Sequence, residues 1–219
     1  MPTSTVSGRR PLQIREVPLV HTIARWLSQQ NIHPNTISIA SVGFSALAAV
    51  CFLLVPLTSG GARVLTLLGA ALGIQLRLLC NLFDGMVAVE SWKRTKSGEL
   101  FNDIPDRIAD PLILVAAGYA IPLFSYGPAL GWAAGFLAVM TAYVRVLGSS
   151  QGVSADFQGP MAKQHRMATM TVACLLSLVE PRLGWDGLVI AWSLWLIILG
   201  CVITLIRRVR HAYRILENS

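Results

Sequence analysis

The stretch NLFDGMVAVESWKRTKSGELFNDIPDRIAD, from Asn81 to Asp110, decides the fold of this chain and directs the search for a functional site. It places carboxylates and carboxamides at helical spacings between flanks that are strongly apolar. Asn81, Asp84, Gly85 and Ala88 fall at i, i+3, i+4 and i+7, so they share one face of a helix. The small residues leave that face open beside the polar pair.

A second polar helix face follows after a short basic connection. Gly98, Asn102 and Asp106 repeat the i, i+4 spacing and again share a face. Two antiparallel helices that offer oxygen donors at similar depth form a simple frame for a Mg²⁺-like ion and a phosphate. The stretch therefore predicts a polar site between two apolar helices, where charge needs a functional reason.

Composition indicates an integral membrane protein. The chain is 54% hydrophobic and 13% charged, well below the roughly 25% charge of soluble domains. Six segments approach the roughly 20 residues that cross a bilayer as a helix. They are Thr36–Pro56, Val64–Val89, Leu100–Phe124, Pro128–Leu147, Met167–Val179 and Gly187–Ile206, of which the fifth has a short apolar core.

Lysine and arginine are distributed unequally between the two ends of these segments. Thirteen lie in the flanks at one end: Arg9, Arg10, Arg15, Arg25, Lys93, Arg94, Lys96, Lys163, Arg166, Arg207, Arg208, Arg210 and Arg214. The opposite flanks hold only Arg63 and Arg182. The positive-inside rule then places both termini and the polar site at the cytoplasmic face, in a bacterial inner membrane.

The N-terminal region contains no apolar signal-peptide core, and residues 19–30 form an amphipathic pattern. Val20, Ile23 and Leu27 line one face, which suits either a helix on the membrane surface or a helix packed on the protein. We therefore expect an all-α integral membrane protein with an N-terminal interfacial helix and six transmembrane helices. Its parts are a cytoplasmic segment at 1–35, a membrane domain at 36–208 and a cytoplasmic tail at 209–219.

The polar stretch resembles the signature of the CDP-alcohol phosphotransferase family. The family pattern is Asp, two residues, Asp-Gly, two residues, Ala-Arg, eight residues, Gly, three residues, Asp, three residues, Asp. Every gap is kept here, at Asn81, Asp84-Gly85, Ala88-Val89, Gly98, Asn102 and Asp106. Three residues depart from the pattern: Asn81 and Asn102 replace Asp, and Val89 replaces Arg. The Pro34-Asn35-Thr36 element, with Ser38 in place of a family Thr, extends the resemblance more weakly.

The resemblance implies a transferase of phospholipid synthesis. In the implied reaction an alcohol hydroxyl attacks the phosphorus of a CDP-alcohol, most commonly CDP-diacylglycerol, and CMP is released. It implies Mg²⁺ or Mn²⁺ as cofactor and Asp106 as general base. The implied metal ligands are Asn81, Asp84, Asn102 and Asp106, and the implied nucleotide-binding residues are Asp84, Gly85, Ala88 and Gly98. A looser match assigns Arg145, Lys163 and Arg166 to the acceptor or its phosphate.

The Asn replacements leave Asp84 and Asp106 as the only acids at matched positions, which predicts one tightly bound divalent ion unless Glu90 or Asp103 adds charge. Three hypotheses follow: an active enzyme, an impaired relative that still binds nucleotide or lipid, and a structural membrane protein. The net charge of +7 is accounted for by topology and anionic lipid, so no nucleic-acid partner is expected.

Two further expectations concern packing. Arg77 and Asp110 lie one helical turn deeper than Asn81 and Asp106, so an ion pair between them is predicted. A small-residue groove at Gly127, Gly131 and Gly135 suits close helix contact. Packing within the monomer explains this groove about as well, but the resemblance implies a homodimer through the third and fourth helices.

Overall fold

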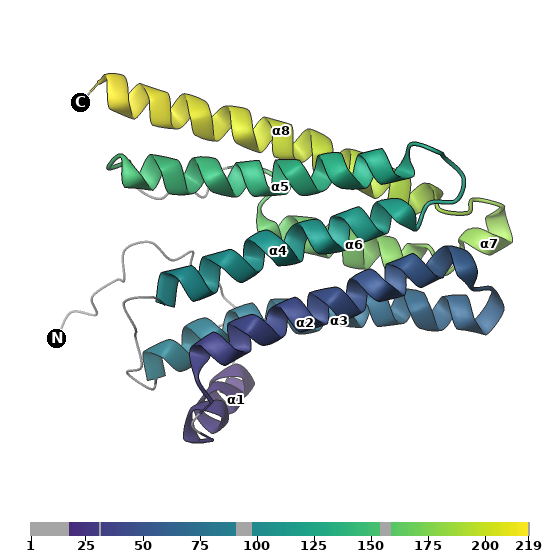
Figure 1. Ribbon diagram of the computed structural model, residues 1–219, viewed down its shortest axis with the longest axis horizontal. Coiled ribbons are helices and arrows are strands. Elements are labelled where there is room, and N and C mark those ends of the chain that lie inside the picture. The colour runs from purple at the N-terminus through teal and green to yellow at the C-terminus, as the bar shows by residue number, and fades with distance from the viewer. Residues whose placement is uncertain (1–17, 31, 91–97, 154–158, 219) are drawn as a thin grey trace.

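A computed structural model describes residues 18–30, 32–90, 98–153 and 159–218, and the regular secondary structure of this part of the chain is all helical (Figure 1). The elements in chain order are α1 (Pro18–Gln29), α2 (Pro34–Leu54), the 3₁₀ turn η2 (Val55–Leu57), α3 (Gly60–Glu90), α4 (Gly98–Tyr119), α5 (Gly127–Ser150), α6 (Lys163–Leu176), α7 (Glu180–Leu183) and α8 (Leu188–Glu217). Each of the six predicted apolar segments contains a helix, so the predicted fold class is confirmed in its all-helical character.

The long helices lie side by side and alternate in direction (Figure 1). α2 packs on α3 and α4, α5 packs on α4 and α8, and α6 packs on α3 and α8. The alternation brings the end of α3, the start of α4 and the start of α6 to one end of the bundle. The polar residues predicted to form a site are carried by these three helix ends.

Four helices of the described chain are long and apolar enough to cross a membrane. They are the segments Pro34–Leu57, Gly60–Ala88, Gly127–Ser150 and Leu188–Glu217. α4 carries several charges, and α6 has only 14 residues, about 21 Å of helix against a hydrocarbon core of about 30 Å. Both lie against neighbouring helices, which shield part of their surfaces. Four of the six predicted spans therefore meet the length and composition expected of a spanning helix.

A single apolar core joins the long helices. Its fully buried side chains include Phe52, Ile74, Ile113, Met170 and Ile197, from five different helices. Many large apolar side chains on the outside, such as Trp192 on α8, are exposed. An apolar exterior around an apolar core is the arrangement expected where lipid replaces water.

The glycine groove on α5 is filled by α4 of the same chain. A Cβ at Gly131 would lie 2.8 Å from the backbone oxygens of both Leu114 and Val115, and one at Gly127 would lie 2.7 Å from the oxygen of Gly118. The expectation that this groove forms a dimer interface is therefore wrong, because its surface is already used inside the monomer. The homodimer itself remains a prediction from the resemblance.

The amphipathic helix α1 packs on the protein through part of its apolar face. Val20 and Ala24 are buried in a small cluster with Leu82 and Met86 of α3. Arg25 and Trp26 are exposed. α1 therefore packs on the protein beside the part of α3 that carries Asp84, and its place at the membrane surface stays a prediction.

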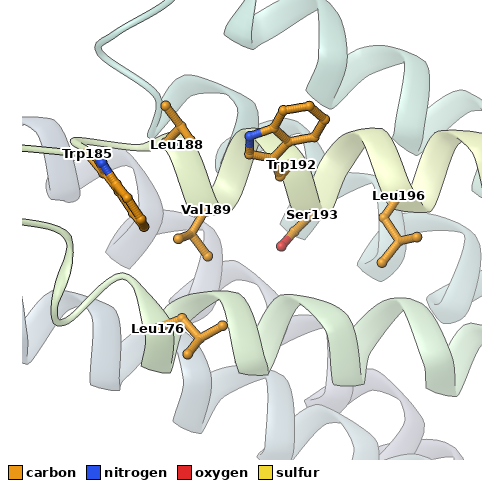
Figure 2. Close-up of a pocket in the computed structure, with 7 residues that line it drawn as sticks. All are labelled: Leu176, Trp185, Leu188, Val189, Trp192, Ser193 and Leu196. Carbon is orange, nitrogen blue, oxygen red and sulfur yellow. The ribbon is translucent and has the colours of Figure 1, made fainter. Parts of the chain in front are cut away.

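The opposite end of the bundle is closed by α7 and by the start of α8. Glu180 is fully buried and accepts hydrogen bonds from the backbone N–H groups of Gly187 (3.2 Å) and Val189 (2.6 Å). Arg63 lies 3.7 Å from the same carboxylate. Figure 2 shows the apolar cavity at this end, about 450 Å³, between Leu176 of α6 and Trp192 of α8. It lies at the end of α6 away from Lys163, so it is separate from the polar site.

Candidate functional site

Asp84 and Asn81 occupy the last turns of α3, where the helix face predicted from the sequence is formed. Asp84 is buried, and its Oδ2 accepts a hydrogen bond of 2.6 Å from the hydroxyl of Ser38 on α2. Ser38 is placed by the start of α2, where Pro34 opens the helix and His33 caps it. The sequence singled out Ser38 only as a weak family match and did not predict this contact, because it joins residues 46 positions apart.

Asn81 carries an amide with unmet hydrogen-bonding capacity. Its Oδ1 and Nδ2 are both buried and have no hydrogen-bond partner among the described residues. A buried polar group left in this state costs about 1–3 kcal/mol. An unpartnered carboxamide one helical turn before Asp84 is the feature expected of a site that receives a ligand.

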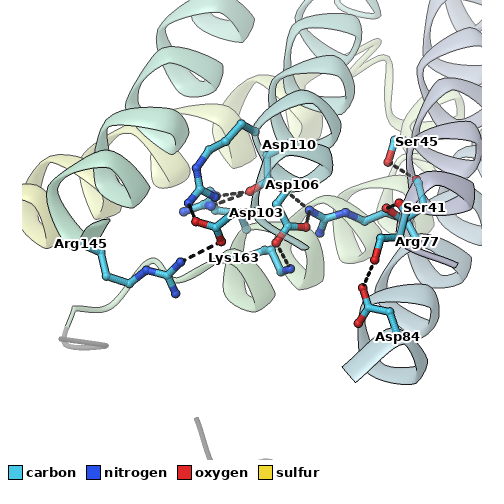
Figure 3. A network of polar contacts seen from close by, with 12 residues as sticks. Ser41, Ser45, Arg77, Asp84, Asp103, Asp106, Asp110, Arg145 and Lys163 are labelled. Atoms are coloured by element: carbon cyan, nitrogen blue, oxygen red, sulfur yellow. Dashed lines mark hydrogen bonds and ion pairs between the residues drawn. The ribbon is translucent and has the colours of Figure 1, made fainter. Parts of the chain in front are cut away.

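Asp106 lies between two cations (Figure 3). Its Oδ1 is 3.1 Å from Nη2 of Arg77 on α3, and its Oδ2 is 2.5 Å from Nζ of Lys163 on α6. The Asp106 side chain is 10% exposed, against 28% for Lys163. Lys163 was predicted to meet a phosphate, whereas the partnership of Asp106 with Arg77 was not foreseen.

Asp110, one turn further along α4, joins two buried arginines. Its Oδ1 lies 2.5 Å from Nη2 of Arg77 and its Oδ2 lies 2.6 Å from Nη2 of Arg166. The predicted ion pair between Arg77 and Asp110 is confirmed. Arg166 also donates to the backbone oxygen of Met161 (3.0 Å) and to the hydroxyl of Thr141 (3.4 Å), so this guanidinium is held on several sides.

A more exposed ion-pair group lies beside this network. Asp103, 36% exposed, contacts Arg107 on the same helix at 2.9 Å and Arg145 on α5 at 3.3 Å. Figure 3 shows Arg145 reaching from α5 toward this carboxylate. Asp103, considered as an additional source of negative charge for a metal, is therefore already paired with two cations.

The fold brings most of the predicted site residues to one end of the bundle. Asp84 lies close enough to Lys163 and Asp106 to interact with both electrostatically. Gly85 and Ala88 continue the Asp84 face of α3. Gly98 and Asn102 belong to the first turns of α4, but the side chain of Asn102 and those of Val89 and Glu90 lie outside the described part of the structure.

The described residues offer few acidic ligands for a metal ion. Within the described ranges there is no group of three His, Cys, Asp or Glu side chains that can hold a metal. The unpartnered amide of Asn81, next to the carboxylate of Asp84, does offer oxygen ligands of the kind that Mg²⁺ and Mn²⁺ prefer. Asp106, the other acid at a matched position, is paired with Arg77 and Lys163.

Comparisons with known proteins agree with this arrangement at the level of the fold. No family model matches the chain. An inner membrane protein of Escherichia coli K12, YnbA, is 24% identical over 187 residues, which cover 83% of this chain and 88% of that protein.

Solved structures of the phosphatidylinositol phosphate synthase PgsA1 of Mycobacterium tuberculosis are similar to this chain. The form with CDP-DAG bound gives a TM-score of 0.74 at 17% identity and covers 90% of this chain and 94% of that one. The form with manganese and citrate gives a TM-score of 0.73 at 18% identity and covers 89% of this chain and 88% of that one. At these identities the likeness shows a shared fold, and the resemblance stated from the sequence is confirmed at that level.

Proposed function

We propose that this chain is a CDP-alcohol phosphotransferase of the bacterial inner membrane, with CDP-diacylglycerol as donor, an alcohol as acceptor and CMP as leaving group. The observation that carries the proposal is that the signature residues of α3 and α4 lie at one end of the bundle, where Arg77 of α3 is 3.1 Å from Asp106 of α4. The kept spacing of the signature and the fold shared with PgsA1, one form of which has CDP-DAG bound, support it.

Each group of proposed site residues has its own role in this reaction. Asn81, Asp84, Asn102 and Asp106 would hold a divalent ion, which supplies positive charge to the diphosphate of the donor. The nucleotide can approach the helix backbone closely at Gly85 and Gly98, which have no Cβ, and at Ala88, which has only a methyl group. Arg145 and Lys163 reach the same end of the bundle and supply positive charge for a phosphate.

Asp106 is the proposed general base. The acceptor hydroxyl gives its proton to this carboxylate while its oxygen forms a bond to the phosphorus attached to the lipid. The bond from that phosphorus to the CMP oxygen breaks, and CMP leaves with the electron pair. Lys163 is paired with Oδ2 of Asp106, so we expect substrate binding to rearrange that contact before the proton is transferred.

Arg166 fits a different role from the one suggested by the sequence. It is 4% exposed and bound to Asp110, Met161 and Thr141. We assign it to holding α4, α5 and α6 together, which leaves Lys163 and Arg145 as the proposed phosphate contacts.

The test is CMP release from CDP-diacylglycerol by the purified protein, with Mn²⁺ or Mg²⁺ and a panel of acceptors that includes glycerol phosphate, inositol phosphate and free glycerol. Asp106→Asn is expected to lower the rate by at least about 10²-fold, because removal of a general base typically costs 10²–10⁴-fold. Asp103→Asn, which changes a more exposed acid on the same helix, is the matched control and should retain most of the rate.

The outcomes separate the three hypotheses. Binding of labelled CDP without CMP release from any acceptor would favour an impaired relative that still binds nucleotide. Failure to bind either CDP or CDP-diacylglycerol would favour a structural membrane protein. Equal rates for Asp106→Asn and the unmodified protein would remove Asp106 as the base.

A further inference from the structure

Each oxygen of the Asp106 carboxylate is already paired with a cation. Arg77 is 3.1 Å from Oδ1 and Lys163 is 2.5 Å from Oδ2. A divalent ion that approaches this carboxylate must displace one of the two cations or bind beside them against their repulsion. Metal binding at Asp106 is therefore a competition within the protein.

The two cations are not equally able to leave. Arg77 is fully buried and also holds Asp110. Lys163 is 28% exposed, lies at the first residue of α6 and carries its ammonium on a flexible four-carbon stem. Within the described residues, the hydrogen bond of its Nζ is to Asp106. Lys163 is therefore the cation that can move from Asp106.

Asp84 and the ion pairs of Asp106 and Asp110 carry charges that balance without a metal, when the more exposed group of Asp103, Arg107 and Arg145 is counted separately. Asp84, Asp106 and Asp110 contribute three negative charges, and Arg77, Lys163 and Arg166 contribute three positive charges. The Asn residues at positions 81 and 102 add none. A bare divalent ion would leave an excess of two positive charges, whereas an ion that arrives with a diphosphate of two negative charges restores the balance.

We propose that the ammonium of Lys163 is a built-in counter-ion of Asp106 that takes the place of a divalent cation, and that the donor diphosphate draws it away. The inference rests on the proposed function and deepens it by describing how the same site is regulated. Without nucleotide, Lys163 neutralises Asp106 and keeps divalent ions weakly bound. With nucleotide, Lys163 moves to the phosphate and Asp106 becomes free to act as ligand and base.

The pairing of Asp106 with Lys163 changes the metal affinity expected from the sequence. Asp84 and Asp106 were expected to balance one tightly bound Mg²⁺, on the assumption that both carboxylates were free. Since Asp106 is already neutralised, metal binding to the protein without nucleotide is now expected to be weak, and to tighten when the diphosphate is present.

The experiment measures Mn²⁺ binding to the purified protein in detergent without nucleotide, by the electron paramagnetic resonance signal of free Mn²⁺. Lys163→Met keeps much of the stem and removes the charge, so it should bind Mn²⁺ about tenfold more tightly or more, as expected when a like charge within a few ångströms is removed. Lys163→Arg keeps the charge and should bind Mn²⁺ as weakly as the unmodified protein.

The matched control is Arg107→Met, which removes one positive charge from α4 next to Asp106 in sequence. Arg107 binds Asp103 instead of Asp106, so its removal should change Mn²⁺ affinity less than threefold, within the weak range of exposed pairs. An equal tightening in Arg107→Met and Lys163→Met would overturn the inference, because a general field effect would then explain both.

A second arm locates the effect at Asp106. In an Asp106→Asn background, Lys163→Met should no longer tighten Mn²⁺ binding, because the shared carboxylate is absent. A persistent gain in that background, or unchanged affinity in Lys163→Met with a normal melting temperature, contradicts the proposal. CMP release is assayed separately. If Lys163→Met binds Mn²⁺ more tightly but no variant releases CMP, the proposed enzymatic function is rejected and the counter-ion role of Lys163 is supported.

Discussion

At the scale of single residues, Asp110 holds together three helices through two buried ion pairs. Replacing it by alanine leaves Arg77 and Arg166 without this partner in a buried setting. Loss of one partner of a buried pair costs about 3–5 kcal/mol. We expect Asp110→Ala to lower the melting temperature strongly while nucleotide affinity, measured on the folded fraction, changes little.

Asp103→Ala is the comparison for this prediction. Asp103, also on α4, binds Arg107 and Arg145, but it is 36% exposed, and an exposed ion pair contributes about 0–1 kcal/mol. A similar loss of stability in the two variants would show that burial does not decide the strength of these pairs. A larger loss of nucleotide affinity than of stability in Asp110→Ala would instead place Asp110 in the binding site.

At the scale of elements, the contact between α4 and α5 depends on glycine. A Cβ at position 131 would meet backbone oxygens of α4 at 2.8 Å, and backbone atoms yield less readily than a flexible side chain. Overpacking of this kind typically costs about 1–3 kcal/mol. We therefore expect Gly131→Ala to destabilise the monomer, as measured by thermal unfolding in detergent.

Gly43→Ala provides the control on α2, since nothing lies within 4 Å of a Cβ at that position. It should be neutral, or stabilising by about 0.5–1 kcal/mol, because alanine favours the helix more than glycine does. Unfolding at the same temperature for Gly131→Ala and the unmodified protein would show that the close approach of α4 and α5 is not required.

At the scale of the whole molecule, the alternation of helices places the polar site and the basic flanks at one end. Ser150 ends α5 at that end, and Ser59 precedes α3 at the other. Both are exposed. The basic asymmetry also predicts that Ser97, in the connection before α4, is protected from an impermeant external reagent, but Ser97 lies outside the described residues. Ser150 therefore serves as the position to label at this end.

The topology is tested by labelling introduced cysteines in intact cells with an impermeant thiol reagent. Ser59→Cys should be labelled from outside and Ser150→Cys should be labelled only after the membrane is opened, because the 13-to-2 basic asymmetry favours a cytoplasmic site. The chain with its own four cysteines gives the background. Labelling of Ser150→Cys from outside, with Ser59→Cys protected, would place the polar site on the periplasmic side.

The sequence alone determined the helices, their apolar character and the shared face of Asn81 and Asp84, because helical spacing and hydrophobicity are local properties. It also predicted the pair of Arg77 and Asp110, since antiparallel helices joined by a short connection set the relative depth of their residues.

Only the tertiary structure decided what lies beside each polar residue. The contacts of Asp84 with Ser38 and of Asp106 with Lys163 join positions 46 and 57 residues apart. They depend on how α2 and α6 are rotated against the signature helices, and the filling of the α5 groove by α4 depends on packing in the same way. Sequence spacing fixes which residues share a face, whereas the packing of distant helices decides which surface that face meets.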